Sequence, residues 1–567
     1  MTHIASGRPS SGDAIVRSAL WAAAGDVLGW ITELAREGGV QARTGQSFVD
    51  RPMDWKRLIG GRAGVRILLP AGTYSDDTQL RLAVCRSIRG DGAFDAEAFA
   101  CIELPAFQNY ALGAGRGTKA AAANLSRRGV NWFSNFFEKP TSYVAAGGNG
   151  AAMRVQPHVW AMRDGGLDAM TTAVLRDAIV THGHPHGFAG AVFHAQTLAV
   201  SLSTGRVPEP SDWRDIVKNI RSLADRVEDD RQLSAFWKPA WEDQANIKLS
   251  VAAARFCEEA MADVDLVASI VGRDGAKKYP EILNILGCYD DKYRGSGWKT
   301  ALAAAALAGL HKDNPAAALI EAANEVGSDT DTIATMAGAI LGAVAPVDPD
   351  WAIQDRDYIV REARRLSRIG AGEICDSFSY PDVARWQAPS AQVNFVGKFG
   401  DRLALAGLGV LEPVSDEAAS GDTIWQWMKL PFGQTVLAKR RAQVRTKISP
   451  SDLPGERRPV KSVELPRPSS ATLEPSLPFA HMPGTSIGTR RQGQSLPIRN
   501  EEPRASDVRT MNLDELTDKI IASKFDDKMI GAYLNILIDK GCAIEIIASF
   551  AAIIAKAKIA RRKRFAG

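Results

Sequence analysis

Helical periodicity dominates the first two thirds of this 567-residue chain. Between residues 13 and 370, apolar side chains recur every three to four positions, as at Ile15, Ala19 and Ala23, which fall on one face of a helix. The clearest such stretches are residues 77–88, 167–180, 188–202 and 298–310. Glycine-rich breaks separate the stretches at residues 113–117, 147–150, 183–187 and 295–297. Alternating strand patterns are scarce, so the sequence predicts an all-α, compact multi-helix domain over residues 12–370.

The remainder of the chain divides into three parts by composition. Residues 371–449 contain Trp386, Trp425 and Trp427 among apolar runs, and we expect them to form an extension that packs on the helical domain. Residues 450–508 hold ten of the 28 prolines, and this composition buries too little apolar surface to offset chain entropy, which predicts a disordered linker. Residues 509–567 return to helical spacing, which predicts a small C-terminal helical hairpin.

Composition narrows the class of protein. An apolar content of 45% with 24% charged residues is typical of globular proteins. We find no uninterrupted apolar run near the ~20 residues that span a bilayer, so no transmembrane segment is expected. The six cysteines are scattered without CxxC spacing, which favours neither disulfides nor zinc and makes a reducing cytoplasm the expected location. A net charge of +4 predicts no partner, and nothing in the sequence indicates an oligomeric state.

The chain ends in a basic tail without acidic residues. Its cations are Lys556, Lys558, Arg561, Arg562, Lys563 and Arg564. An apolar stretch precedes the tail, so it is compatible with binding to nucleic acid or to an anionic membrane surface. The alternative is a solvated helix end whose charge complements the helix dipole.

Two acidic clusters lie about 250 residues apart, SDDT at residues 75–78 and SDTDT at 328–332, and each opens an Ala-rich helical stretch. Taken singly, such a cluster is typical of a helix N-cap. If the fold brings the two together, their four Asp repel one another unless some are protonated or a cation binds. Hard divalent cations such as Mg²⁺ prefer oxygen ligands of this kind. The pair of clusters therefore suggests a metal centre built from two helix starts.

Three further segments carry chemical groups. Residues 25–33 (GDVLGWITE) combine two glycines that permit close backbone approach with a third acidic group, Glu33. Residues 148–154 (GNGAAMR) offer backbone N–H groups to a phosphate or ribose. Residues 181–185 (THGHP) present imidazoles on a turn stiffened by proline.

In this order, the five segments resemble the ADP-ribosylglycohydrolase family, whose pattern is GDxxGxxxE, [ST]DDT, GNGAAMR, THxHP and GGDTDT. The resemblance covers roughly residues 13–347. Ser75 stands where Thr is common, Ser328 replaces the second Gly of GGDTDT, and Trp30 fills a position that is usually small, at the expected rim of the pocket.

The resemblance implies two Mg²⁺ or Mn²⁺ ions in the centre of an all-helical domain. The implied metal ligands are Ser75, Asp76, Asp77, Asp329, Asp331 and Thr332. Glu33 matches an acidic residue close to the metals. The implied catalytic carboxylates are Glu33, Asp76, Asp77 and Asp331, and the sequence does not decide which of them takes a proton from water.

The resemblance also implies contacts to ADP-ribose from Asn149, Gly150 and His182. Looser matches add Gly115, Gly148, Gly297 and Trp298, although an aromatic in an apolar helix is as often a core residue. A separate transition-metal site formed by His182, His184 and His186 is the less favoured alternative, because the oxygen-rich clusters suit a hard metal better.

The expected function is hydrolysis of the glycosidic bond between ADP-ribose and a modified target, most simply an arginine on a protein. Two alternatives stay open. The target is instead a modified nucleic acid or base, or the domain is a non-catalytic module that binds ADP-ribose.

Overall fold

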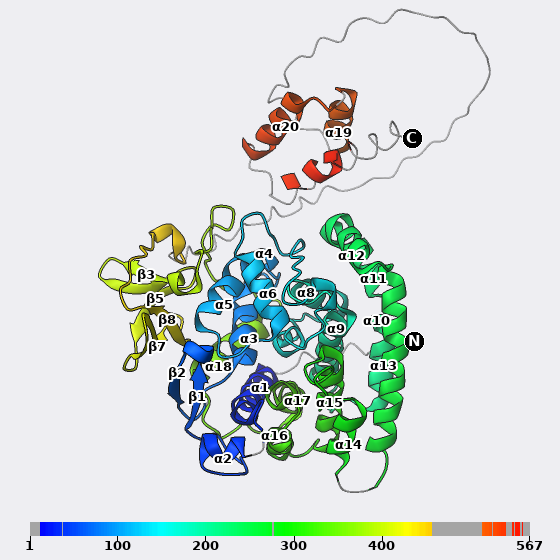
Figure 1. The fold of residues 1–567 in the computed structure, drawn as a ribbon. Helices are drawn as coiled ribbons and strands as arrows, with labels where there is room; N and C mark the ends of the chain where they lie inside the picture. Colours follow the sequence, from blue (N-terminus) through cyan, green and yellow to red (C-terminus); the bar gives the residue numbers. More distant parts are fainter. Residues whose placement is uncertain are drawn as a thin grey trace, which may run out of the picture. The chain divides into compact units, whose positions relative to one another are not determined.

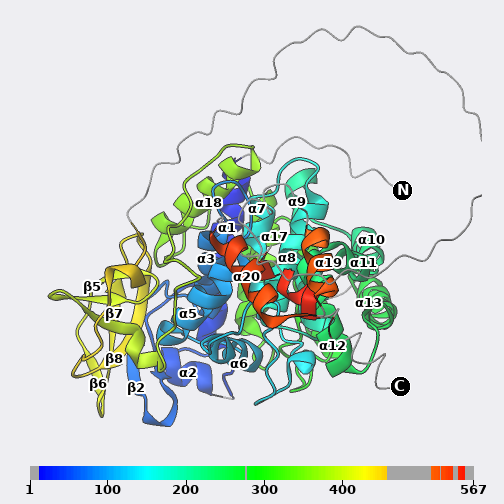
Figure 2. The ribbon, with the colours of Figure 1, turned by 90° about the horizontal axis from the view of Figure 1, so that it is seen from above.

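The computed structural model describes residues 12–36, 38–274, 277–455, 513–523 and 525–539, with most of 547–555 and Lys558. The chain divides into two compact units, one up to Val460 and one after it. Figure 1 shows the larger unit as a body of helices with a small sheet at one side, and Figure 2 shows the same arrangement from above. The linker expected over 450–508 lies outside the described residues from residue 456 onward.

The larger unit is mainly helical, and the four clearest periodic stretches of the sequence coincide with the helices that begin at Asp76, Leu167, Pro185 and Gly297. The helices are α1 (Gly12–Thr32), α2 (Gly39–Thr44), α3 (Asp76–Ser87), α4 (Ala96–Ala98), α5 (Leu104–Tyr110), α6 (Arg116–Leu125), α7 (Gln156–Trp160), α8 (Leu167–Ile179), α9 (Pro185–Thr204), α10 (Pro210–Ile220), α11 (Leu223–Asp229), α12 (Lys238–Ala245), α13 (Leu249–Val271), α14 (Lys278–Ile285), α15 (Gly297–Leu310), α16 (Pro315–Asn324), α17 (Thr330–Val344) and α18 (Arg356–Gly370).

Helices α1 and α17 lie side by side at the centre of the core (Figure 1). Four glycines allow their backbones to touch. A Cβ on Gly25 or Gly29 of α1 would lie 2.3 or 2.4 Å from a carbonyl oxygen of α17, and a Cβ on Gly338 or Gly342 of α17 would lie 2.3 or 2.6 Å from one of α1. Because no side chain fits at these positions, the glycine spacing fixes the contact between the two helices.

Helix α1 is long and apolar enough to cross a membrane by length and composition alone, although Arg17 and Asp26 interrupt its apolar run. In the structure, 89% of its most apolar window is buried inside the protein. It packs against α16, α17 and α18, as a core helix does.

The all-α prediction is wrong in two places. An antiparallel hairpin, β1 (Trp55–Ile59) and β2 (Val65–Leu69), follows α2. The extension after residue 370 contains a six-stranded antiparallel sheet in the order β3-β4-β5-β7-β6, with β8 pairing β7. Its strands are β3 (Val396–Phe399), β4 (Arg402–Leu405), β5 (Gly409–Pro413), β6 (Ala418–Ser420), β7 (Thr423–Lys429) and β8 (Thr435–Arg441).

Buried polar contacts fasten this sheet to the helices. The Arg86 guanidinium of α3 forms an ion pair with Glu103 (2.7 Å) and also donates to the Gln434 Oε1 before β8 (2.7 Å). On α5, the Asn109 amide donates to the backbone oxygens of Gln392 and Lys439, both at 2.7 Å. The extension therefore belongs to the same compact unit as the helices.

The second unit is described only in part. It contains α19 (Leu513–Ala522) and α20 (Asp527–Asp539), which share a separate apolar core with Phe550 and Ile554. Of the basic tail, Lys558 lies 3.2 Å from Asp527. Residues 559–567 are outside the described residues, and the binding roles expected of the tail stay predictions.

Candidate active site

The two acidic clusters meet at the starts of α3 and α17. Ser75 is the N-cap of α3, and its Oγ accepts a hydrogen bond from the Asp77 backbone N–H (3.2 Å). Thr332 in the first turn of α17 donates from its hydroxyl to Asp77 Oδ1 (3.3 Å). The Asp331 carboxylate accepts from the Thr332 N–H (2.9 Å). The fold thus brings the predicted ligands of the two clusters together, although they are about 250 residues apart in sequence.

Asp26 holds the first cluster in place, a role that the sequence analysis missed. Its two carboxylate oxygens accept from the backbone N–H groups of Ser75 (2.9 Å) and Thr78 (2.8 Å) at the start of α3. The side chain is fully buried. Asp26 lies between Gly25 and Gly29, so α1 both touches α17 and fixes the orientation of α3. The aspartate in the GDxxG segment was the available signal.

Negative charge is concentrated at this meeting point. Burial, followed by the charge of Glu33, raises the pKa of Asp76 to about 7. Burial and the charges of Asp26 and Asp76 raise the pKa of Asp77 well above its usual range, and burial with Glu33 does the same for Asp331. Each carboxylate is therefore less stable in its ionised form here than in water.

One basic side chain is buried nearby. Arg81 of α3 donates to Thr335 of α17 and to Gln156 Oε1 (3.2 Å), and its charge lowers the pKa of Asp77. It also donates to Thr78 Oγ1 (3.4 Å) but to none of the cluster's carboxylates, and among the described residues Asp77 Oδ2 is buried without a hydrogen-bond partner. A buried carboxylate oxygen without a donor is unusual, because its desolvation is then uncompensated.

The oxygen donors of the two clusters are the groups that would hold the two cations implied by the resemblance. Within the described ranges, no three Asp, Glu, His or Cys side chains are already arranged as a metal-ligand group, so the expected dimetal centre is not seen. The unpartnered Asp77 Oδ2 and the clustered oxygens nevertheless fit a hard divalent cation, which prefers carboxylate and hydroxyl oxygens. The oxygens fit such a cation in their chemical type and in their burial.

Glu33 lies just beyond the end of α1, and its carboxylate pairs with Arg57 of β1 (3.0 Å). Burial raises the pKa of Glu33, while Arg57 opposes the shift. The Arg57 guanidinium lies 5.2 Å from the Trp30 ring centroid. Trp30 is fully buried beneath it, so the expectation that Trp30 shapes the pocket rim is wrong. Arg57 was not found from the sequence, because it lies in a hairpin outside every motif.

The glycine-rich segments surround the His182 imidazole. A Cβ on Gly117 or Gly148 would lie 3.4 Å from His182 Nε2, and one on Gly150 would lie 3.5 Å from it. Burial and the charge of Arg154 lower the pKa of His182 to about 3, so the ring is neutral. These contacts bring three of the predicted substrate residues, Gly148, Gly150 and His182, to one place.

A buried ion pair supports this histidine. Arg154 donates to Asp177 Oδ1 (2.8 Å), to the Gly150 carbonyl oxygen (2.8 Å) and to Thr181 Oγ1 (2.9 Å). Thr181 Oγ1 in turn lies 2.7 Å from His182 Nδ1. The GNGAAMR and THGHP segments are thereby locked together through charge-assisted hydrogen bonds.

The same glycine segment connects to the second acidic cluster. The Asn149 amide donates to Asp329 Oδ2 (2.9 Å), and the Asn149 N–H donates to the Gly295 carbonyl oxygen (2.9 Å). Gly297 lies across from it, where its N–H donates to the Gly147 carbonyl oxygen (3.0 Å). Gly115 is the exposed N-cap residue of α6, with open space where a Cβ would lie.

Two predicted or suspected residues have structural positions instead. Trp298 is fully buried, its Nε1 donates to Asp263 (2.7 Å), and Phe193 and Phe256 pack against it. It exposes no ring face to a nucleotide, so the core interpretation holds for Trp298. His186 lies between Ser296 (2.9 Å) and Glu259 (3.1 Å), which agrees with a structural role rather than a metal site.

Comparison with known proteins identifies the family. The family model described as ADP-ribosylglycohydrolase matches residues 9–372. No curated protein sequence matches the chain. A solved structure named "ADP-ribosylglycohydrolase-related protein complex" is similar, with a TM-score of 0.40 and 19% identity, over 64% of this chain and 99% of that chain. Because the family model covers more than half of its length, this chain belongs to the ADP-ribosylglycohydrolase family.

Proposed function

We propose that the protein hydrolyses the glycosidic bond that joins ADP-ribose to a modified target, by means of water activated at a site for two divalent cations, Mg²⁺ or Mn²⁺. The proposed cation ligands are Ser75, Asp76, Asp77, Asp329, Asp331 and Thr332. One observation carries the proposal. Several buried carboxylates raise one another's pKa at the meeting of two helix starts, and the Asp77 Oδ2 among them has no hydrogen-bond donor in the described part of the chain.

Bound cations would supply Lewis-acid chemistry there, polarising a water molecule and the ribose hydroxyls. The protein's own groups supply the rest. Carboxylates around the ribose stabilise the positive charge that grows on the ring as the bond breaks. Glu33, or one of the aspartates, accepts the proton of the attacking water. The pairing with Arg57 keeps Glu33 oriented, while burial raises its pKa and makes the carboxylate a stronger base.

His182 is proposed to bind the ADP-ribose as a neutral hydrogen-bond donor. The Thr181 hydroxyl accepts from Arg154, so its own proton is available to His182 Nδ1. The imidazole hydrogen then lies on Nε2, which faces Gly117, Gly148 and Gly150. The absence of side chains at these glycines lets a phosphate or ribose approach the imidazole and the backbone N–H groups.

Arginine on a protein is the target that the resemblance implies, and it is the first substrate to assay. A nucleic-acid target is the second candidate, favoured by lysines and arginines on the sheet beside the site. A non-catalytic binding module would not need so many mutually repelling carboxylates. The five cysteines that lie in the described residues are unpaired, which supports the proposal of a reducing, cytoplasmic location.

The test measures release of free ADP-ribose from an arginine-ADP-ribosylated protein, with Mg²⁺ and then with EDTA. We expect metal-dependent release by the wild type, none by Asp331→Ala, and normal release by Asp313→Ala, which removes an exposed carboxylate outside the site. Unchanged release by Asp331→Ala would refute the assigned centre. Tight binding of ADP-ribose in a calorimeter, without release from arginine, would refute the arginine target but would still support the assigned ADP-ribose site.

A further inference from the structure

A cavity of about 470 Å³ lies where the β1–β2 hairpin and the end of α5 meet the sheet of the C-terminal extension. Ile59, Ala111, Trp425 and Lys439 are among its lining residues. Two of these lining residues, Ile59 and Ala111, are close in sequence to residues of the proposed active site. Ile59 is two residues beyond Arg57, the partner of Glu33, and Ala111 is two residues before Gly113, where a Cβ would lie 1.9 Å from Asp76 Oδ1.

Lys439 and Lys119 contribute positive charge on this side of the molecule. Lys439 of β8 lines it and donates to Gln392 Oε1. Lys119 of α6 is exposed and lies two residues beyond Gly117, at the His182 end of the site. Burial, followed by the charge of Lys119, lowers the pKa of Lys439 to about 8. An anion placed between the two lysines would remove this repulsion.

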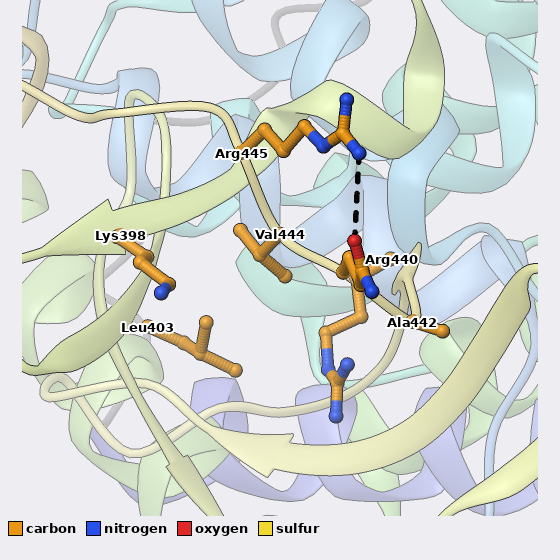
Figure 3. A pocket seen from close by; sticks show the side chains of 7 residues that line it. Lys398, Leu403, Arg440, Ala442, Val444 and Arg445 are labelled. Atoms are coloured by element: carbon orange, nitrogen blue, oxygen red, sulfur yellow. Dashed lines mark hydrogen bonds between the residues drawn. The ribbon is translucent and has the colours of Figure 1, made fainter.

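A second cavity, of about 510 Å³, lies against the same strand. Figure 3 shows Lys398 on one side of it, and Arg440 and Arg445 on the other. Within the ranges that the structure describes, Arg440 Nε is buried without a hydrogen-bond partner. Successive side chains of a strand point to opposite faces. Lys439 lines the first cavity and Arg440 the second, so the two cavities lie on opposite faces of the end of β8.

Few acids balance these cations. Residues 438–447 (AKRRAQVRTK) contain five basic residues and no acidic one. Arg440 pairs with Glu417 and Arg441 with Asp422. Across the described part of the chain, Lys119, Lys398 and Arg445 have no carboxylate within ion-pair distance. The end of β8 is thus a cationic surface of the sheet that continues to the rim of the proposed active site.

We propose that this surface holds the target, and that the target is a single-stranded nucleic acid whose successive phosphates lie at Lys119 and Lys439 and then at Lys398, Arg440 and Arg445. The proposal rests on the proposed hydrolase function and names its substrate class. Phosphates repeat along a strand, and cations repeat along and around β8, whereas an arginine target would be repelled by Lys119 and Lys439. The extension, which the family model does not cover beyond residue 372, then selects the target.

The first experiment measures binding of a short, unmodified, fluorescein-labelled single-stranded DNA to the full-length chain by anisotropy. The variant is Lys119→Gln/Lys398→Gln/Arg445→Gln. All three positions are exposed, and Lys398 and Arg445 line the second cavity, so the fold of the variant is expected to stay intact. Each phosphate contact contributes about −0.7 to the slope of log affinity against log salt. From about 50 to about 200 mM NaCl, the wild type should therefore lose about 20-fold more affinity than the variant.

A matched control removes the same charge elsewhere. Arg231→Gln/Lys312→Gln/Arg364→Gln replaces three exposed cations of the helical body and should bind DNA as the wild type does. An equal loss in both triple variants would overturn the proposal, because net charge alone would then explain binding. So would an unchanged sheet variant, or a loss seen only when the tail cations from Lys556 to Arg564 are replaced.

Two further outcomes separate this inference from the function on which it rests. If polyglutamate displaces the labelled DNA as effectively as unlabelled DNA does, the nucleic-acid target is refuted in favour of an acidic protein. Failure of Mg²⁺-dependent ADP-ribose release from every substrate would overturn the hydrolase proposal alone, since the DNA assay uses an unmodified strand. On an ADP-ribosylated oligonucleotide, the sheet variant should raise KM more than it lowers kcat.

Discussion

Replacement of Asp26 by Asn tests whether α1 positions the first acidic cluster. The Asp26 carboxylate accepts two backbone hydrogen bonds, from Ser75 and Thr78, one at each oxygen. Asn keeps one acceptor, and its NH₂ group then faces the other N–H. That backbone N–H and the NH₂ that faces it both lack an acceptor there, and each buried donor left unsatisfied costs about 1–3 kcal/mol. Relief of the repulsion between Asp26 and Asp77 offsets part of this cost, and we expect a net loss of about 2 kcal/mol in the free energy of unfolding.

The loss converts to a measurable shift. Unfolding entropy of roughly 2 cal/mol/K per residue gives about 1 kcal/mol/K for the unit up to Val460, so Tm should fall by about 2 °C. Asp95→Asn is the matched control, because Asp95 caps α4 with one accepted bond, to the Ala98 N–H (2.9 Å), which Asn can keep. Differential scanning fluorimetry measures both variants, with and without Mg²⁺.

The metal dependence supplies a second readout. A cation at about 100 times its Kd stabilises the wild type by about 2.7 kcal/mol, or about 3 °C in Tm on the same scale. With Ser75 and Asp77 displaced in Asp26→Asn, this increment should shrink, whereas Asp95→Asn should keep it. An Asp26→Asn protein with unchanged Tm and an unchanged Mg²⁺ increment would refute the positioning role, as would an equal fall in Asp95→Asn.

Two further predictions follow from particular contacts. Gly29→Ala should abolish folded, soluble protein, because its Cβ would lie 2.4 Å from the Thr330 carbonyl oxygen, whereas Gly309→Ala, with open space around it, should raise stability by about 0.5–1 kcal/mol in chemical denaturation. Burial and Lys119 lower the pKa of Lys439 to about 8, so a rise from pH 7 to pH 9 removes the positive charge of Lys439, and DNA affinity should fall. Lys439→Arg should remove this pH dependence, and a fall of the same size in that variant would contradict the role of Lys439.

The helical core was predictable because its periodicity is strong and its glycines are spaced for contact. The sheet was missed for a physical reason. β7 (TIWQWMK) is buried at five consecutive positions, so it lacks the alternation that marks a half-buried strand. β4 and β6 are only four and three residues long, too short for a period to register. Their pairing depends on contacts between segments that sequence patterns do not reveal.

The site divides in the same way. Motifs located the carboxylates, the glycines and His182, because each lies at a helix start or a turn with a recognisable local pattern. Arg57 was not predictable, since its pairing with Glu33 depends on how a hairpin of the chain folds back. For Trp298, the sequence pattern suggested a functional role that the structure does not support. Its motif position suggested a ligand contact, but the Asp263 partner that satisfies its indole N–H comes from a different helix, α13.

The carboxylates are held together by a scaffold that leaves them little freedom to separate. Gly25 and Gly29 let α1 touch α17 along its backbone, and Asp26, between these glycines, fixes α3 through two hydrogen bonds. Three helices that carry or orient the acidic groups are thus joined through one segment of nine residues, GDVLGWITE. Because the backbone contact cannot loosen without losing core packing, the repulsion among the acids cannot relax by helix movement. Protonation of some of the acids lowers this electrostatic energy, and binding of the proposed divalent cation would lower it as well, because the oxygen ligands are already held close together.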